Sequence, residues 1–137
     1  MWKFYALLSA LFAALTAVFA KMGVRGVDSN LAMAIRTTVI LFIAWGVVFL
    51  LGGQGQMREL SRRTFFFLAL SGGTTGLSWL FYFKALQSGP VSKVAPIDKL
   101  SVAMAMLLAF LILGETPDMK TVVGGLLIVA GSIVILF

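Results

Sequence analysis

Five long runs of apolar residues restrict the fold of this chain more than any other feature of its sequence. Each run is close to the roughly 20 residues that a helix needs to cross the hydrocarbon core of a bilayer. In lipid only helices and closed barrels satisfy the backbone, and these runs are too long for barrel strands and lack strict alternation. We therefore predict an all-α integral membrane protein, a bundle of five transmembrane helices in one domain, residues 1–137. The expected spans are residues 2–20, 29–53, 63–86, 90–113 and 116–137.

The composition supports this class and excludes several others. Hydrophobic residues make up 61% of the chain and charged residues only 12%, whereas a soluble domain is about half apolar and a quarter charged. The net charge of +6 is scattered between the apolar runs, which favours anchoring at the membrane surface over nucleic-acid binding. A signal peptide ending at Val18-Phe19-Ala20 is the alternative for the first run, but membrane-like sequence follows it throughout.

Catalysis has little support in the sequence. The chain has no cysteine and no histidine, which removes disulfides, Cys/His metal sites and Cys or His nucleophiles. No pair of acids and no Ser/His set suggests an intramembrane enzyme. We therefore expect no enzymatic activity, no cofactor and no metal.

Turn and cap residues mark the ends of the spans. Ser29-Asn30 is a good N-cap pair, and Gly52-Gly53 suits the end of the same helix. Pro90 suits the first position of a new helix after the Ser88-Gly89 turn. Thr116-Pro117-Asp118 supplies an N-cap, a first-turn proline and an acid for the last span.

A deep pair of charges, Asp98 and Lys99, is the strongest sign of function. Asp98 lies about 12 Å along a helix that begins at Pro90, near the middle of a core about 30 Å thick. A charge at that depth is costly unless it faces protein or water. Successive residues point in different directions on a helix, so the two are not expected to pair with each other. Either both form ion pairs with other spans, or at least one serves transport, with Asp98 as the proton-coupling candidate.

Pro96 lies two residues before Asp98 and is expected to kink the helix. Proline has no N–H, so the carbonyl of Ser92 loses its helical partner. An interrupted helix beside buried charges is typical of transporter binding sites, although proline kinks also occur without a ligand. Ser101 belongs to the same small, partly polar stripe as Asp98, and this stripe is expected to face the bundle interior.

Arg36 lies about two turns into the second span. It either extends to the membrane interface or offers a positive charge to Asp98 or to an anionic substrate group. Lys84, near the end of its span, is better explained as an interfacial anchor.

The third span carries a polar stripe on one helical face. Its members recur at spacings of four, three and four: Ser71, Thr75, Ser78 and Tyr82. These hydroxyls either bond back to the preceding turn or line a helix crossing or wet cavity. Trp79 and Phe83 flank the stripe as possible aromatic walls. Two glycine pairs, Gly72 with Gly76 and Gly124 with Gly131 in the fifth span, are typical of close helix packing.

These features together resemble the EamA-type branch of the drug/metabolite transporter superfamily. The resemblance covers nearly the whole chain and is carried by Arg36, residues 82–86 before Gly-Pro, Pro96, and residues 113–115. Residues 94–101 look like the short, single-repeat members of that branch. The resemblance implies one repeat of five helices; most relatives fuse two such repeats with the halves inverted, so a single repeat implies a dimer.

Two functions remain open from the sequence. The first is a half-size secondary transporter, proton- or exchange-driven, that moves a small metabolite or amphipathic solute across a prokaryotic inner membrane. Arg36 and Lys99 would then bind the polar end of the substrate, and Trp79, Tyr82 and Phe83 its apolar part. The alternative is an accessory or assembly subunit of a heteromeric carrier, such as a lipid-carrier flippase.

The distribution of basic residues bears on how two copies associate. Lys and Arg near span ends set orientation, and here neither side has a clear excess. We therefore expect an antiparallel homodimer with dual topology, with a parallel dimer as the competing arrangement. The seam is expected at Gly72-Gly76 or at Gly124-Gly131. One side carries Lys3, Arg58, Arg62, Arg63 and Lys120, and the other carries Lys21, Arg25, Lys84 and Lys93.

Overall fold

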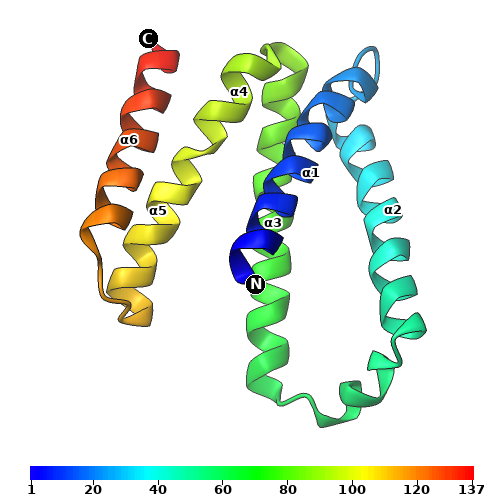
Figure 1. The fold of residues 1–137 in the computed structure, drawn as a ribbon. Helices are drawn as coiled ribbons and strands as arrows, with labels where there is room; N and C mark the ends of the chain where they lie inside the picture. The colour runs from blue at the N-terminus through cyan, green and yellow to red at the C-terminus, as the bar shows by residue number, and fades with distance from the viewer. The chain divides into compact units, whose positions relative to one another are not determined.

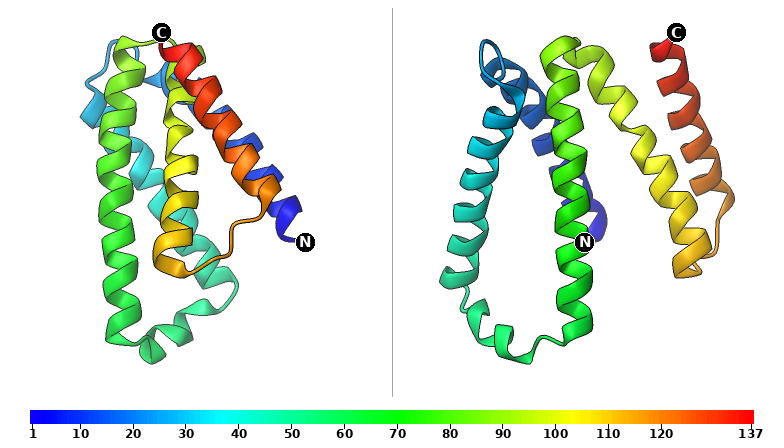
Figure 2. Two further views of the ribbon diagram at one scale, coloured as in Figure 1. Left: turned by 90° about the vertical axis from the view of Figure 1, so that its left-hand side faces the viewer. Right: turned by 180° about the vertical axis from the view of Figure 1, so that it is seen from behind.

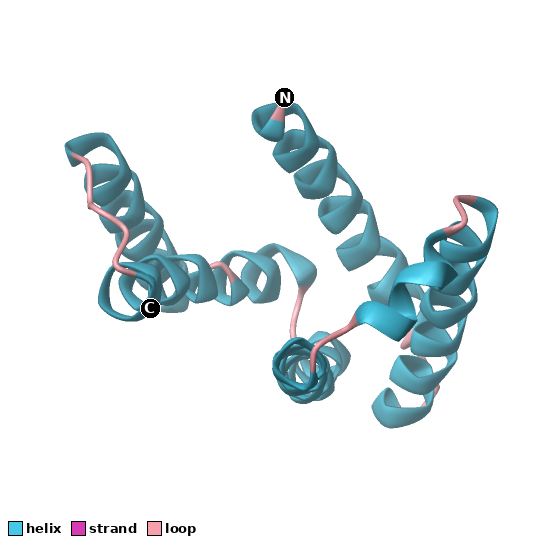
Figure 3. Ribbon diagram, turned by 90° about the horizontal axis from the view of Figure 1, so that it is seen from below, coloured by secondary structure: helices cyan, strands magenta, loops and turns pink.

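The computed structural model describes residues 1–137 and contains helices and no strand (Figure 1, Figure 3). Five of its helical segments are long and apolar enough to cross a membrane, so the predicted all-α fold with five spans is confirmed. The chain divides into two compact units, one made of residues 1–18 with 88–137 and the other of residues 19–87. The spans are Trp2–Gly23 (α1), Ser29–Leu50 (α2), Arg62–Ser88 (α3), Val91–Leu113 (α4, α5 and η2 in succession) and Met119–Leu136 (α6).

In the unit of residues 19–87, α2 and α3 run antiparallel and are joined by a short 3₁₀ helix, η1, over Gly53–Glu59 (Figure 1). The Asp28 carboxylate caps α2 by accepting the backbone N–H groups of Asn30 at 2.9 Å and Leu31 at 3.1 Å. The prediction that Ser29-Asn30 forms this cap was therefore wrong by one residue, because a carboxylate at 28 reaches two free amides at once. Gly52 follows the helix with a φ of 73°, a conformation that glycine adopts without strain.

Two long-range hydrogen bonds connect the end of α3 with the last turn of α1 and with the loop between α1 and α2. The Lys21 ammonium donates to the carbonyl of Leu86, and the Gln87 amide donates to the carbonyl of Val27 at 2.9 Å. Val24 and Leu86 are buried in the same region. The two side chains thus satisfy a carbonyl in the last turn of α3 and a carbonyl in the loop before α2.

In the other unit, α6 packs against α4 (Val91–Asp98) and α5 (Leu100–Leu108), and a π-helical turn, η2 (Ala109–Leu113), precedes the loop to α6 (Figure 2). Two predicted helix starts were each misplaced. Pro90 is the N-cap of α4 rather than its first residue, because its ψ of 145° is extended. Asp118, not Thr116, caps α6, because its carboxylate accepts the Thr121 N–H at 2.8 Å.

The contact face of α6 differs from the predicted one. Gly125 and Ser132 are the buried residues of this helix, and a Cβ added at Gly125 would lie 2.9 Å from the Cε of Met106 on α5. A Cβ added at Gly124 or Gly131 would meet no atom within 4 Å, so these two glycines do not pack within the chain. Their role as a dimer seam stays a prediction.

Candidate functional site

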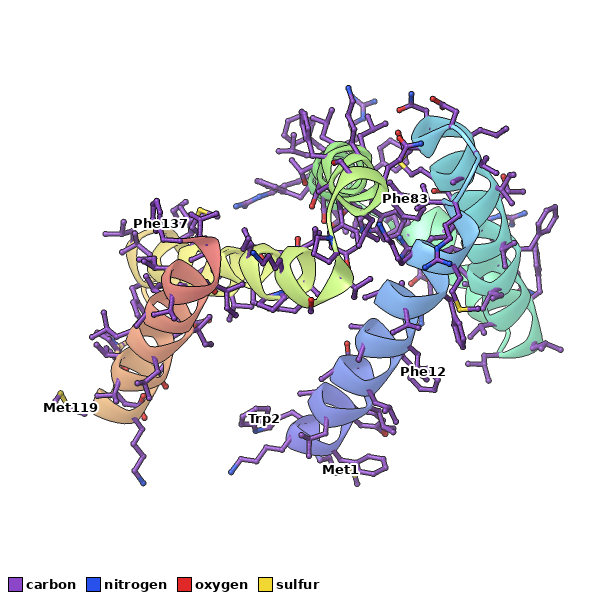
Figure 4. The ribbon with its side chains drawn as sticks, turned by 90° about the horizontal axis from the view of Figure 1, so that it is seen from above. Met1, Trp2, Phe12, Phe83, Met119 and Phe137 are labelled. Carbon is purple, nitrogen blue, oxygen red and sulfur yellow. The ribbon has the colours of Figure 1, made fainter.

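Arg36 of α2 meets two aromatic rings of α3. Its guanidinium carbon lies over the rings of Trp79 and Phe83, at 4.2 Å and 5.4 Å from the ring centroids. The two aromatics are four residues apart and therefore share one face of α3. Figure 4 shows Phe83 among the side chains between these two helices. A cation over an aromatic face gains about 2 kcal/mol or more when it is removed from water, which makes this a favourable place for a charge at membrane depth.

The predicted polar stripe of α3 is only partly free to bind anything. The Thr75 hydroxyl donates to the carbonyl of Ser71 at 2.8 Å, which is the local bond that competes with a cavity-lining role. Thr74, outside the stripe, bonds back in the same way, to the carbonyls of Leu70 and Ser71. Ser71 and Ser78 are exposed, and Tyr82 is partly buried.

The fourth span is interrupted at the deep charges. α4 ends at Asp98, Lys99 has a φ of −69° and a ψ of −8°, and α5 begins at Leu100. Lys99 Nζ lies 3.6 Å from Asp98 Oδ2, with 53% of the lysine and 36% of the aspartate side chain exposed. The expectation that these neighbours do not pair was wrong. It assumed a regular helix, and the break at Lys99 together with a long, flexible side chain brings the two charges together.

Two hydroxyls bind backbone carbonyls around this break. Ser101 donates to the carbonyl of Asp98 at 2.6 Å, and Ser132 of α6 donates to the carbonyl of Pro96 at 3.0 Å. The predicted helix interruption near Pro96 is present. The carbonyl that a second helix binds is that of Pro96 itself, where the sequence drew attention to Ser92.

An apolar groove of about 470 Å³ lies between α5 and α6. Its walls carry no charged side chain, so it suits a lipid chain or an apolar helix face better than a polar solute. No feature of the sequence had predicted this groove. Its lining residues are Leu100, Ala103, Met104, Met106, Leu107, Phe110, Val122, Gly125, Leu126 and Val129.

The structure thus forms two clusters of the predicted site residues, one in each unit. Arg36, Trp79 and Phe83 come together in the unit of residues 19–87. Pro96, Asp98, Lys99 and Ser101 come together at the α4–α5 break of the other unit, with Ser132 as a contributor that the sequence analysis missed. That all of these residues line one cavity stays a prediction.

Residues 1–137 match the EamA-like transporter family. The chain is 48% identical over 134 residues to a protein of a Sinorhizobium species described as an "Uncharacterized transporter in cobO 3'region", with 98% of this chain and 95% of that protein covered. No solved structure matches the chain.

Proposed function

The chain belongs to the EamA-like transporter family, and from this premise we propose that it is a half-size secondary transporter for a small amphipathic solute. It is a membrane transporter rather than an enzyme. We further propose that dimerisation completes the transport path and that the protein resides in a prokaryotic inner membrane, in keeping with its bacterial relative.

The interrupted fourth span is the observation that carries this proposal. A carboxylate and an ammonium stand at a helix break inside a segment suited to crossing the membrane, and both remain partly exposed. Charges at such depth persist where protein or a water-filled path covers them. Broken helices with freed backbone groups are the places where secondary transporters bind solutes and coupling ions.

The need for a second copy follows from the faces that stay open. Asp98 and Lys99 are not covered within their own unit, and the glycine pair Gly72 and Gly76 has open space beside it. A second copy in the opposite orientation would shield these residues from the lipid, and the balanced distribution of Lys and Arg allows both orientations. An antiparallel homodimer is therefore the proposed assembly.

Proton coupling through Asp98 is tested in proteoliposomes loaded with a pH-sensitive dye. We expect an added solute, drawn from amino acids, nucleosides, organic acids and amphipathic cations, to start proton movement. Asp98→Asn should abolish that movement, while Asp118→Asn, which neutralises an exposed loop carboxylate, should leave it unchanged. Unchanged coupling in Asp98→Asn would remove this residue from the mechanism. Solute movement that strictly requires a second gene product would favour the accessory-subunit function instead.

A further inference from the structure

Arg36 is a charge at membrane depth that lacks an opposite charge in its own unit. It lies seven residues after Ser29, or about 10 Å along the axis of α2. Arg36 is not part of the Asp98–Lys99 ion pair and forms no hydrogen bond, and the polar side chain that interacts with it electrostatically is Tyr82 of α3. The carboxylates of its unit are Glu59, in the distant η1, and Asp28, which accepts two backbone N–H groups at the start of α2.

The aromatic contacts stabilise the charge of Arg36 but leave its hydrogen-bonding capacity unused. Trp79 and Phe83 offer ring faces, at 4.2 Å and 5.4 Å, and no acceptor lone pair. The guanidinium therefore retains five N–H donors in one plane, a geometry that matches a carboxylate or phosphate through two parallel hydrogen bonds. An oxyanion would satisfy the charge and the donors together.

Room for such a ligand exists on the same face of α3. Gly72, Gly76, Trp79 and Phe83 follow one another at spacings of four, three and four, so they share one helical face. A Cβ at either glycine would meet no atom within 4 Å. Toward the middle of α3, this face therefore has open space at both glycine positions.

We propose that Arg36 binds the oxyanion of the transported solute, a small organic carboxylate or phosphate, whose body lies over Gly72 and Gly76. This inference rests on the proposed transport function and narrows its substrate class. Trp79 and Phe83 then act as positioning residues that hold the guanidinium, not as walls for the apolar part of the solute.

Binding is measured in phosphatidylcholine nanodiscs from the fluorescence of Trp79, in a Trp2→Phe/Trp45→Phe background. The probes are benzoate, phenyl phosphate and the neutral isostere benzamide. Arg36→Gln should weaken benzoate binding tenfold or more, which corresponds to about 1.4 kcal/mol or more. Arg36→Lys keeps the charge and loses the planar fork, so it should also weaken binding. Arg63→Gln is the matched control, because its guanidinium lies over Phe67 at 5.9 Å near the start of α3.

Several outcomes would overturn the inference. Benzoate binding that survives both Arg36 substitutions in well-folded protein would identify Arg36 as an interfacial anchor, as would equal binding of benzamide. A tenfold gain of benzoate affinity in Asp98→Asn would show that Arg36 already has an internal anion. Loss of the benzoate response when phosphatidylglycerol is added to the nanodiscs would show that the site binds a lipid headgroup, and it would overturn the proposal that the ligand is a soluble solute.

The binding assay contains no transport step, which separates this inference from the proposed function. Arg36-dependent binding without any solute movement in proteoliposomes would overturn the transport function alone. Solute transport that Arg36→Gln leaves unchanged would support the function and overturn the anion site.

Discussion

The contact between Gly125 and Met106 predicts opposite outcomes for two neighbouring glycines of α6. A Cβ added at Gly125 would lie 2.9 Å from the Cε and 3.3 Å from the Sδ of Met106, whereas one added at Gly124 would meet nothing within 4 Å. Carbon atoms pack best at about 3.5–4.0 Å. A valine at position 125 must therefore displace Met106 or move α6 away from α5.

The expected magnitudes follow from these distances. Gly125→Val should lower the free energy of unfolding by about 1–3 kcal/mol, the usual cost of overpacking a helix contact. Gly124→Val should change it by about 0.5 kcal/mol or less. Gly125→Ala should be close to neutral, because the flexible end of Met106 can move and alanine gains about 1 kcal/mol of helix propensity over glycine.

The assay is unfolding in mixed micelles of increasing dodecyl sulfate content, followed by circular dichroism. The loss in the double variant Gly125→Val/Met106→Ala should be at least about 0.5 kcal/mol smaller than the sum of the two single losses, as expected for residues in contact. Equal losses at positions 124 and 125, or a double variant with simply additive losses, would refute the packing of α6 described above.

Three further predictions test other contacts and the topology. Ser132→Ala should lower the free energy of unfolding in the same titration by about 0.6 kcal/mol, a typical value for a hydrogen bond between membrane helices. The loss is small because the Pro96 carbonyl still accepts the Lys99 N–H at 3.1 Å; a loss near zero would contradict the interhelical bond. The side-chain and backbone hydrogen bonds from Thr121 hold the pKa of Asp118 below its ordinary value. The stabilisation by the Asp118 carboxylate is therefore present at pH values above the ordinary pKa and is lost as the pH falls through the lowered pKa. Asp118→Asn should remove this acid sensitivity from the unfolding titration. Reporter fusions should place the two termini of each copy on opposite sides of the membrane, and one added Lys on either side should shift the orientation of the population in opposite directions; a parent that labels from one side only would contradict dual topology.

The spans could be predicted from the sequence because their signal is local. A run of apolar residues long enough to cross a bilayer has few alternative structures, and Gly52 ends its helix near the predicted place. The helix starts were misplaced by one or two residues where several polar residues compete. Asp28 and Asp118 are the actual caps, because an ionised carboxylate accepts amide hydrogens more strongly than a hydroxyl does.

The contacts between helices could not be predicted in the same way. Gly124 with Gly131 and Gly125 with Ser132 have the same spacing of seven, so periodicity alone does not decide which pair faces α4 and α5. The pairing of Arg36 with aromatic rings depends on the approach of α3, which is remote in sequence. Motif recognition placed Arg36 among the site residues but did not reveal how its charge is stabilised.

The charges well inside the spans lead to a last prediction, on electrogenicity. In the empty state the Asp98–Lys99 pair is neutral, and Arg36 leaves one positive charge. In the proposed loaded state, a bound monoanion would neutralise Arg36 and a proton bound at Asp98 would leave the positive charge of Lys99 unbalanced. Both states carry the same net charge, so one anion and one proton should cross together without net charge movement. Uptake of an anion that binds in the nanodisc assay should therefore rise with a pH gradient that is acidic outside, and it should not change with a membrane potential set by valinomycin. An anion that moved alone would gain or lose about 2.3 kcal/mol per 100 mV, and uptake that follows the potential in this way would refute the coupling through Asp98.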